Sequence, residues 1–192
     1  MIQTKEEFLR RLKQDLTRNF YTRKGYILGL IFHEESAYVI RLLKLYRKCV
    51  YLRPNRRKNI FKLIQWIYYS YLYKKYQFKY DTYISLDSDI GGGLWLPHLG
   101  GIIVNCISMG ENCSVTKGVV IGNKAGQENR ARIGRNCYFT LGCKVIGNVC
   151  VGDNVIVAQN SVVVKDVENN SIVSGVPAKV IKKFNSIADV NI

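Results

Sequence analysis

Apolar residues recur at an interval of six along the C-terminal part of the chain. A helix repeats near 3.6 residues and a simple strand near two, so a period of six with intervening turn residues predicts short strands stacked in a β-helix. The series slips by one residue after its first four members and is interrupted by a polar stretch after the next three. Its members are Ile84, Ile90, Leu96 and Ile102, then Met109, Val115 and Ile121, then Ile133, Phe139, Val145, Val151, Val157 and Val163.

Small or apolar residues follow many of these positions by four. They are Cys113, Val119, Cys137, Cys143, Val149 and Val155. Because one short strand cannot bury its apolar side alone, we expect both sets to form a continuous core between stacked coils.

The N-terminal part has a helical pattern. Thr4 followed by Glu7 has the spacing of a capping box, and Pro54 is expected to end a later helix. The predicted helices cover residues 4–20, 34–52 and 57–76.

The chain therefore divides into three parts and is mainly β. Residues 1–80 form a basic, aromatic, α-helical segment, residues 81–175 form the β-helix, and residues 176–192 form a tail that folds over the last coil. The polar interruption at 122–132 (GNKAGQENRAR) is predicted to be an extended loop. Loops that leave a rigid scaffold often carry function.

Charge separates the two halves. The formal net charge is +15, and residues 1–80 hold 19 Lys and Arg against 5 Asp and Glu, whereas residues 81–192 hold 10 against 9. This asymmetry predicts an anionic partner for residues 1–80, and a merely solvated helical face is the alternative. Since no nucleic-acid motif is present, we expect an anionic membrane surface and no nucleic acid.

The six cysteines form no CxxC pair, and there are only two histidines. We therefore expect no metal site, and buried free thiols in a reducing cytoplasm. The sequence shows no signal peptide and no apolar run of membrane-spanning length. The expected location is the cytoplasm, with peripheral attachment to the membrane.

Three local motifs carry a resemblance to a known family. They are LPHLGGIIVN at 96–105, GVVIGNK at 118–124 and SGVPAKVI at 174–181. Their order and spacing resemble the serine-acetyltransferase-like branch of the hexapeptide-repeat acyltransferases, with capsule and surface-polysaccharide O-acetyltransferases as the closest members. The resemblance implies a left-handed parallel β-helix, a homotrimer with active sites shared between subunits, and acetyl-CoA as co-substrate.

Acetyl transfer to a hydroxyl needs a general base and donors for the developing oxyanion. His98 is the candidate base, since it lies in a coil turn within the family motif. His33 lies beside two glutamates in the helical segment and is expected to be a surface residue. The resemblance places the substrate and oxyanion region at Gly100, Gly101, Asn105 and Arg130.

Two departures from the family concern the acceptor. Tyr83 stands where the family has an Asp that orients the histidine, and Pro97 where it has an Asp that meets the amino group of serine. A saccharide hydroxyl is therefore the expected acceptor. Asp81, Asp87 and Asp89 are candidates to replace the orienting carboxylate.

The cofactor positions also come from the resemblance. Backbone contacts to the pantetheine arm and cationic contacts to the nucleotide phosphates are the two kinds expected. The implied residues are Leu141, Gly142, Ala158 and Gln159 for the arm, and Lys165, Lys179 and Lys182 for the phosphates.

Three functions remain open. The first is acetyl-CoA-dependent O-acetylation of a saccharide or surface-polysaccharide precursor. The second is serine O-acetylation in cysteine biosynthesis. The third is a non-catalytic β-helix that binds a partner, and the retained histidine and cations argue against it.

Overall fold

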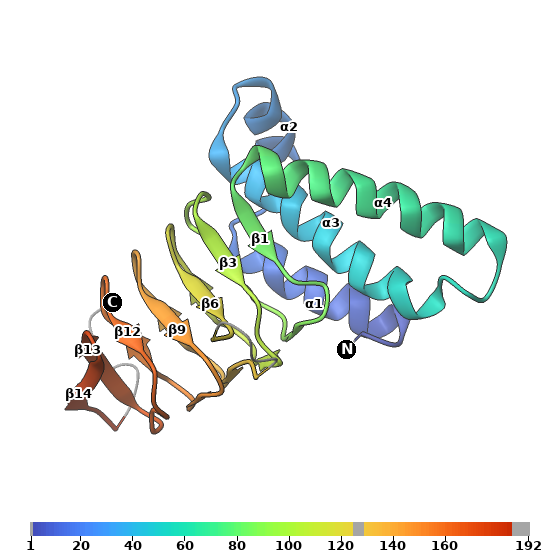
Figure 1. Ribbon diagram of the computed structural model, residues 1–192. Coiled ribbons are helices and arrows are strands. Elements are labelled where there is room, and N and C mark those ends of the chain that lie inside the picture. The colour runs from blue at the N-terminus through green and yellow to red at the C-terminus, as the bar shows by residue number, and fades with distance from the viewer. Residues whose placement is uncertain (1, 125–128, 186–192) are drawn as a thin grey trace.

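The computed structural model describes residues 2–124 and 129–185. A helical segment packs against one end of a row of stacked coils (Figure 1). The helices are α1 (Lys5–Arg18), α2 (Arg23–Ile31), α3 (Glu35–Asn55) and α4 (Ile60–Lys79).

The coils have three faces, and each face is a sheet. Sheet I has the order β1 (Thr82–Ile84), β3 (Ile102–Val104), β6 (Val120–Gly122), β9 (Lys144–Ile146) and β12 (Val162–Val163). Sheet II has the order β10 (Cys150–Val151), β7 (Arg132–Ile133), β4 (Ser108–Met109) and β2 (Asp89–Ile90). Sheet III has the order β14 (Ala178–Lys183), β13 (Ser171–Gly175), β11 (Ile156–Val157), β8 (Tyr138–Phe139) and β5 (Ser114–Val115).

The pairing within these sheets is parallel, except that β14 runs antiparallel to β13. Ile103 pairs with Val120, and Val120 pairs with Lys144, so each coil lies in register over the one before it. The six-residue period is confirmed at every predicted position, because all thirteen side chains of the series are at most 5% exposed. The second set, from Cys113 to Val155, is equally buried.

Asparagines turn the chain at the corner between sheets II and III. Asn112, Asn136, Asn154 and Asn170 have φ values of 60°, 56°, 57° and 55°, a region that asparagine tolerates better than most residues. The Asn136 amide donates to Asn154 Oδ1 at 3.0 Å, and the Asn154 amide donates to Asn170 Oδ1 at 2.7 Å. The turn residues therefore bond to one another from coil to coil.

The helical segment differs from the prediction in two places. Pro54 lies inside α3, which ends one residue later, so few helical residues follow the bond that its missing N–H removes. The sequence pattern missed α2, whose nine residues include two glycines and show no clear apolar stripe. The capping box is confirmed, since Thr4 Oγ1 accepts from Glu7 N at 3.1 Å.

Within the described ranges, no helix is long and apolar enough to cross a membrane.

Candidate active site

His98 lies in the turn that leads into β3, at the corner between sheets III and I. Its side chain is 64% exposed. The imidazole Nδ1 is 3.1 Å from Glu35 Oε2, and Leu99 N donates to Glu35 Oε1 at 2.5 Å. One carboxylate from the first turn of α3 therefore holds both the ring of His98 and the backbone that follows it.

The electrostatics of Glu35 suit this contact. Burial raises the pKa of its carboxyl, but the hydrogen bonds from Leu99 N and His98 outweigh burial and leave the pKa below the ordinary value of 4.5. Lys117 adds a favourable charge nearby. The carboxylate is therefore ionised throughout the neutral range.

The expectation that Asp81, Asp87 or Asp89 contacts His98 is not met, because Glu35 contacts the ring and the three aspartates bond to other groups. Asp81 accepts from Gly101 N at 2.9 Å. Asp87 pairs with Arg53 at 2.6 Å, and Asp89 pairs with Arg11 at 2.8 Å. Nothing in the local sequence pattern points to Glu35, since it lies 63 residues from His98 and meets it through the docking of α3 on the coils.

The expected oxyanion donors at Gly100 and Gly101 are already bonded within the chain. Gly100 N donates to Thr82 Oγ1 at 3.0 Å, and Gly101 N donates to Asp81. Their φ values of +104° and +65° show that these glycines serve the turn itself.

A buried cluster fixes the segment before His98. Arg47 and Asp15 are joined by two bonds of 2.7 and 3.0 Å, and Arg47 also donates to the carbonyl of Ile90 at 2.6 Å. Asp15 accepts from Leu94 N at 2.9 Å, and Asn19 Oδ1 accepts from Leu96 N at 3.2 Å. Helices α1 and α3 thus satisfy the backbone of the strand-poor segment that carries the histidine.

The residues expected at the pantetheine arm lie at the same corner as His98, on later coils. Gly118 N donates to Gly100 O at 3.0 Å, Gly142 N to Lys117 O at 3.1 Å, and Asn160 N to Leu141 O at 2.9 Å. Leu141 is 47% exposed there. The corner therefore aligns Leu141 and Gly142 with Ala158 and Gln159 in one column.

The three lysines do not gather at one place. Lys179 lies on β14 opposite Ser174, beside the end of the column, and Lys182 lies further along the same strand, opposite Ile172. Lys165 follows the C-terminal end of β12 and therefore lies at the corner between sheets I and II, across the strands of sheet I from the column. All three side chains are exposed.

Asn105 and Arg130 are brought together, but away from His98. Arg130 Nη1 donates to Asn105 Oδ1 at 3.1 Å. Four residue steps of extended chain, about 13 Å, separate Gly101 from Asn105 across sheet I. The two residues line a cavity of about 400 Å³, together with Tyr83, Ser85, Asp87 and Asn123. The remainder of the loop predicted at 122–132 lies partly outside the described residues.

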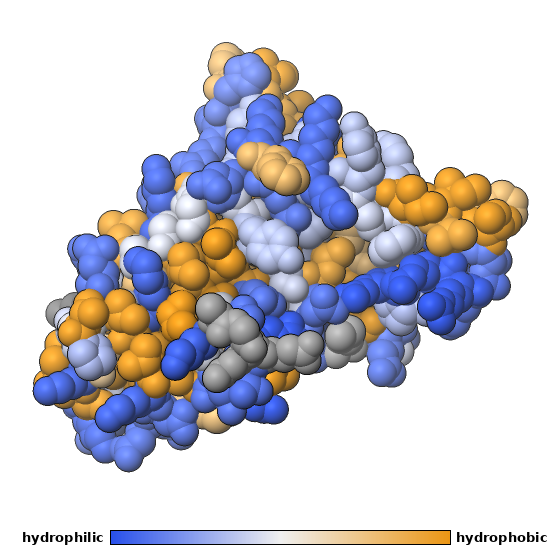
Figure 2. Space-filling view, in the orientation of Figure 1, coloured by the Kyte–Doolittle hydropathy of each residue, from blue (hydrophilic) through white to orange (hydrophobic). Residues whose placement is uncertain are grey.

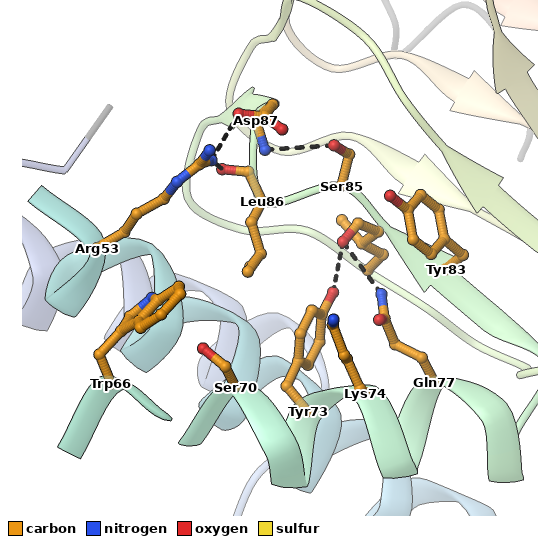
Figure 3. A pocket seen from close by; sticks show the side chains of 11 residues that line it. Arg53, Trp66, Ser70, Tyr73, Lys74, Gln77, Tyr83, Ser85, Leu86 and Asp87 are labelled. Atoms are coloured by element: carbon orange, nitrogen blue, oxygen red, sulfur yellow. Dashed lines mark hydrogen bonds and ion pairs between the residues drawn. The ribbon is translucent and has the colours of Figure 1, made fainter. Parts of the chain in front are cut away.

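A second cavity of about 350 Å³ adjoins the first, between α4 and the first coil (Figure 3). It shares Tyr83, Ser85 and Asp87 with the Arg130 cavity. Trp66 and Lys74 of α4 line its helical side. Trp66 Nε1 is buried without a hydrogen-bond partner among the described residues.

Two further expectations concern His33 and metals. His33 is exposed, and its Nδ1 is 2.5 Å from Tyr38 Oη. Among residues 2–124 and 129–185, no group of three His, Cys, Asp or Glu side chains could hold a metal ion.

No family model matches the chain. A serine acetyltransferase of Staphylococcus aureus (strain Mu50) is 35% identical over 98 residues, which cover 49% of this chain and 46% of that protein. One from Synechococcus elongatus is 32% identical over 95 residues, which cover 48% and 39%. The chain thus matches less than half the length of these curated relatives.

Solved structures match over nearly the whole chain. The serine acetyltransferase of Brucella abortus strain S19, solved in complex with coenzyme A, has a TM-score of 0.72 and 23% identity, covering 94% of this chain and 70% of that one. This likeness confirms the predicted left-handed β-helix with an α-helical N-terminal segment. These matches are to serine acetyltransferases, and they do not show the predicted closeness to capsule O-acetyltransferases. The sequence matches and the fold together make the chain similar to serine acetyltransferases.

Proposed function

We propose that the chain is an acetyl-CoA-dependent O-acetyltransferase with His98 as general base. The observation that carries this proposal is the imidazole of His98, which is 64% exposed and whose Nδ1 lies 3.1 Å from a carboxylate oxygen of Glu35. A base held by a third group is the arrangement that activates a hydroxyl for acyl transfer. A non-catalytic scaffold would have no use for it.

Acetyl-CoA is the proposed acetyl donor. The matched Brucella abortus enzyme was solved with coenzyme A. In this chain, the column of turns from Gly100 to Gln159 offers a straight path from His98 to Lys179. The pantetheine arm would follow that column, and the lysines would meet the phosphates.

Serine is the first candidate acceptor, because the curated relatives are named serine acetyltransferases. The comparisons thus favour the alternative of the sequence analysis over the saccharide. The lack of carboxylates at Tyr83 and Pro97 does not exclude serine as the acceptor, because another carboxylate lies nearby. Asp81 lies at the His98 corner, bonded to Gly101 N, and its exposed carboxylate would meet the ammonium group of serine.

A saccharide hydroxyl remains the second candidate, because of the two adjoining cavities. Together they are larger than serine needs, and Trp66 and Tyr83 offer aromatic surface within them. Amphipathic rings of this kind pack well against partly apolar ligands with hydroxyl groups.

The proposed assembly is a homotrimer with sites between subunits. Within one chain, His98 lies before β3, and the Arg130 cavity includes Asn105, which follows β3, so the two lie at opposite ends of the strands of sheet I. The outer face of that sheet leaves Tyr83 48% and Ile103 42% exposed. Packing of this face against the His98 corner of a second copy would cover both side chains and unite the two halves of the site.

The proposed second partner is an anionic membrane surface. Helix α4 presents an apolar stripe to solvent at helical spacing, and Figure 2 shows hydrophobic side chains gathered where α3 joins α4, beside hydrophilic ones. Each residue of the stripe is more than half exposed: Ile60, Phe61, Ile64, Ile67 and Tyr71. Lysines on the same helix would meet the lipid phosphates.

The acceptor is tested by measuring acetyl transfer from acetyl-CoA, which is monitored through the CoA thiol that the reaction releases. Serine, N-acetylglucosamine and a surface-polysaccharide oligosaccharide are compared. We expect turnover of serine, and Asp81→Asn should raise the KM for serine while leaving the KM for acetyl-CoA unchanged. Turnover of the saccharides with serine inert would establish the second candidate. Inertness of all acceptors, with no CoA binding, would contradict the proposed activity.

A further inference from the structure

Glu35 makes two contacts that join the helical segment to the catalytic corner. Its Oε2 faces His98 Nδ1 and its Oε1 accepts from Leu99 N. We propose that Glu35 is the positioning residue for the base, which fixes both the tautomer and the orientation of the imidazole. This inference rests on the proposed function, and it applies to either acceptor.

The chemistry follows from which nitrogen carries the proton. A neutral imidazole has one N–H donor and one acceptor nitrogen. Because a carboxylate can only accept, Nδ1 must donate to Glu35, and the lone pair is left on Nε2. The atom that abstracts a proton is therefore Nε2 of His98.

The transfer step balances on that nitrogen. Nε2 takes the hydroxyl proton while the acceptor oxygen forms a bond to the thioester carbonyl carbon. The carbon–sulfur bond then breaks, and the thiolate leaves with the proton that Nε2 returns. Between these events the ring is an imidazolium, and the negative charge of Glu35 stabilises it.

The orientation is fixed because the two oxygens of Glu35 bind adjacent residues. The amide of Leu99 cannot rotate independently of the turn, and the Leu99 side chain is only 7% exposed. Helix α3, which carries Glu35 in its first turn, is itself fastened to the first coil through Arg47. The position of the imidazole is thus fixed relative to both the coil and α3.

The neighbouring Glu34 provides a matched control. It is the N-cap residue of α3, its side chain makes no capping bond, and it is exposed. The variants to compare are Glu35→Ala, Glu35→Gln and Glu34→Ala. Loss of an orienting carboxylate lowers kcat by up to about 10⁴-fold in buried triads; for this half-exposed pair we expect roughly 10- to 1,000-fold in Glu35→Ala.

A structural role alone would not produce the expected pattern. In Glu35→Ala, kcat should fall while the KM for acetyl-CoA stays unchanged. Glu35→Gln keeps a neutral acceptor for Nδ1–H and should recover part of the lost rate. Glu34→Ala should match the wild type in kcat and in melting temperature. An equal loss of kcat in Glu34→Ala, or an unchanged kcat in Glu35→Ala, would overturn the proposal.

A spectroscopic measurement separates this inference from the proposed activity. Nitrogen-15 NMR reports the tautomer of each histidine, and the spectrum of His33→Ala assigns the His98 signals. We expect the Nδ1–H tautomer in the wild type and a mixture of tautomers in Glu35→Ala. The pKa of Glu35 is lowered below 4.5, so its carboxylate stays ionised at the neutral pH of this measurement. Tautomers that are identical in the two proteins would refute the positioning role, whatever the acceptor assays show.

Discussion

Asp15 and Arg47 form an ion pair that is almost fully excluded from solvent, with 0% and 1% of their side chains exposed. The pair joins α1 to α3, and Arg47 reaches past it to the carbonyls of Ile90 and Gly91. Helices and coils therefore share one polar cluster, and removal of either partner leaves a buried charge without compensation.

Arg47→Ala should lower the free energy of unfolding by about 3–5 kcal/mol, the usual cost of breaking a buried pair. Urea denaturation followed by circular dichroism measures this change. Arg57→Ala, at an exposed arginine after α3, is the control and should change stability by less than about 0.5 kcal/mol. Equal changes in the free energy of unfolding for the two substitutions would show that the buried cluster does not stabilise the fold more than an exposed arginine does.

His98→Ala should lower kcat by about 100- to 10,000-fold, because the acceptor hydroxyl loses its general base. CoA binding, measured by calorimetry, should survive, since the column of turns does not depend on the imidazole. His33→Ala is the matched control and should retain full activity, because His33 is exposed and its Nδ1 contacts the hydroxyl of Tyr38 within the helical segment. A His98 variant with a near-normal rate would remove the catalytic assignment.

Lys179→Ala should weaken CoA binding by roughly 2- to 10-fold, the range expected for an exposed cation that meets a phosphate. Lys165→Ala tests the assembly, because Lys165 lies at the opposite corner of its own chain. If the cofactor lies between subunits, Lys165→Ala also weakens binding; if one chain holds it alone, only Lys179→Ala does. Lys58→Ala, remote from both corners, should leave the Kd unchanged. Light scattering gives the mass of the assembly independently.

Iodoacetamide should label one thiol per native chain, Cys150, the one exposed cysteine of the six. Burial raises the pKa of Cys49 and Cys143 to about 12, and that of Cys106 to about 11. A hydrogen bond from Cys137 lowers the pKa of Cys113, but Cys113 is fully buried and shielded from the reagent. Mass spectrometry should find six labels after unfolding and none on native Cys150→Ser.

Vesicle co-sedimentation tests the membrane proposal. We expect binding to phosphatidylglycerol vesicles that weakens with salt, and no binding to phosphatidylcholine vesicles. The double variant Phe61→Ser and Ile64→Ser should bind less. Ile181→Ser, at an equally exposed apolar residue on β14, should bind as the wild type does. Absence of binding to either vesicle at low salt would leave the stripe as a packing surface between subunits.

The sequence predicts the coils well because their period is local. Each buried residue of the series stacks between neighbouring coils, so the six-residue spacing from Ile133 to Val163 is enough to predict the strands and their buried side. The candidate base could also be chosen from the sequence, because His98 and its glycines are neighbours in the chain. The column of turns follows from the same repeat.

The partner of the base was not predictable, because nothing local links Glu35 to His98. That contact depends on how α3 docks, and docking depends on the buried cluster of Asp15 and Arg47. For the same reason, the sequence suggested Asp81, Asp87 and Asp89 as partners of His98. They are close to it in sequence but are bonded to other groups. The positions of Lys165 and Lys179 at different corners likewise become clear only from the three-dimensional arrangement of the coils.

The antiparallel direction of β14 has a consequence for polymerisation. A parallel stack of coils ends in an edge whose unpaired N–H and C=O groups match the next coil of any similar chain, so it can template endless growth. β14 reverses the strand direction at that edge of sheet III and carries Lys179, Lys182 and Lys183 on its exposed length. A chain cut before β14 would present β13 bare, and end-to-end fibres would be its expected fate.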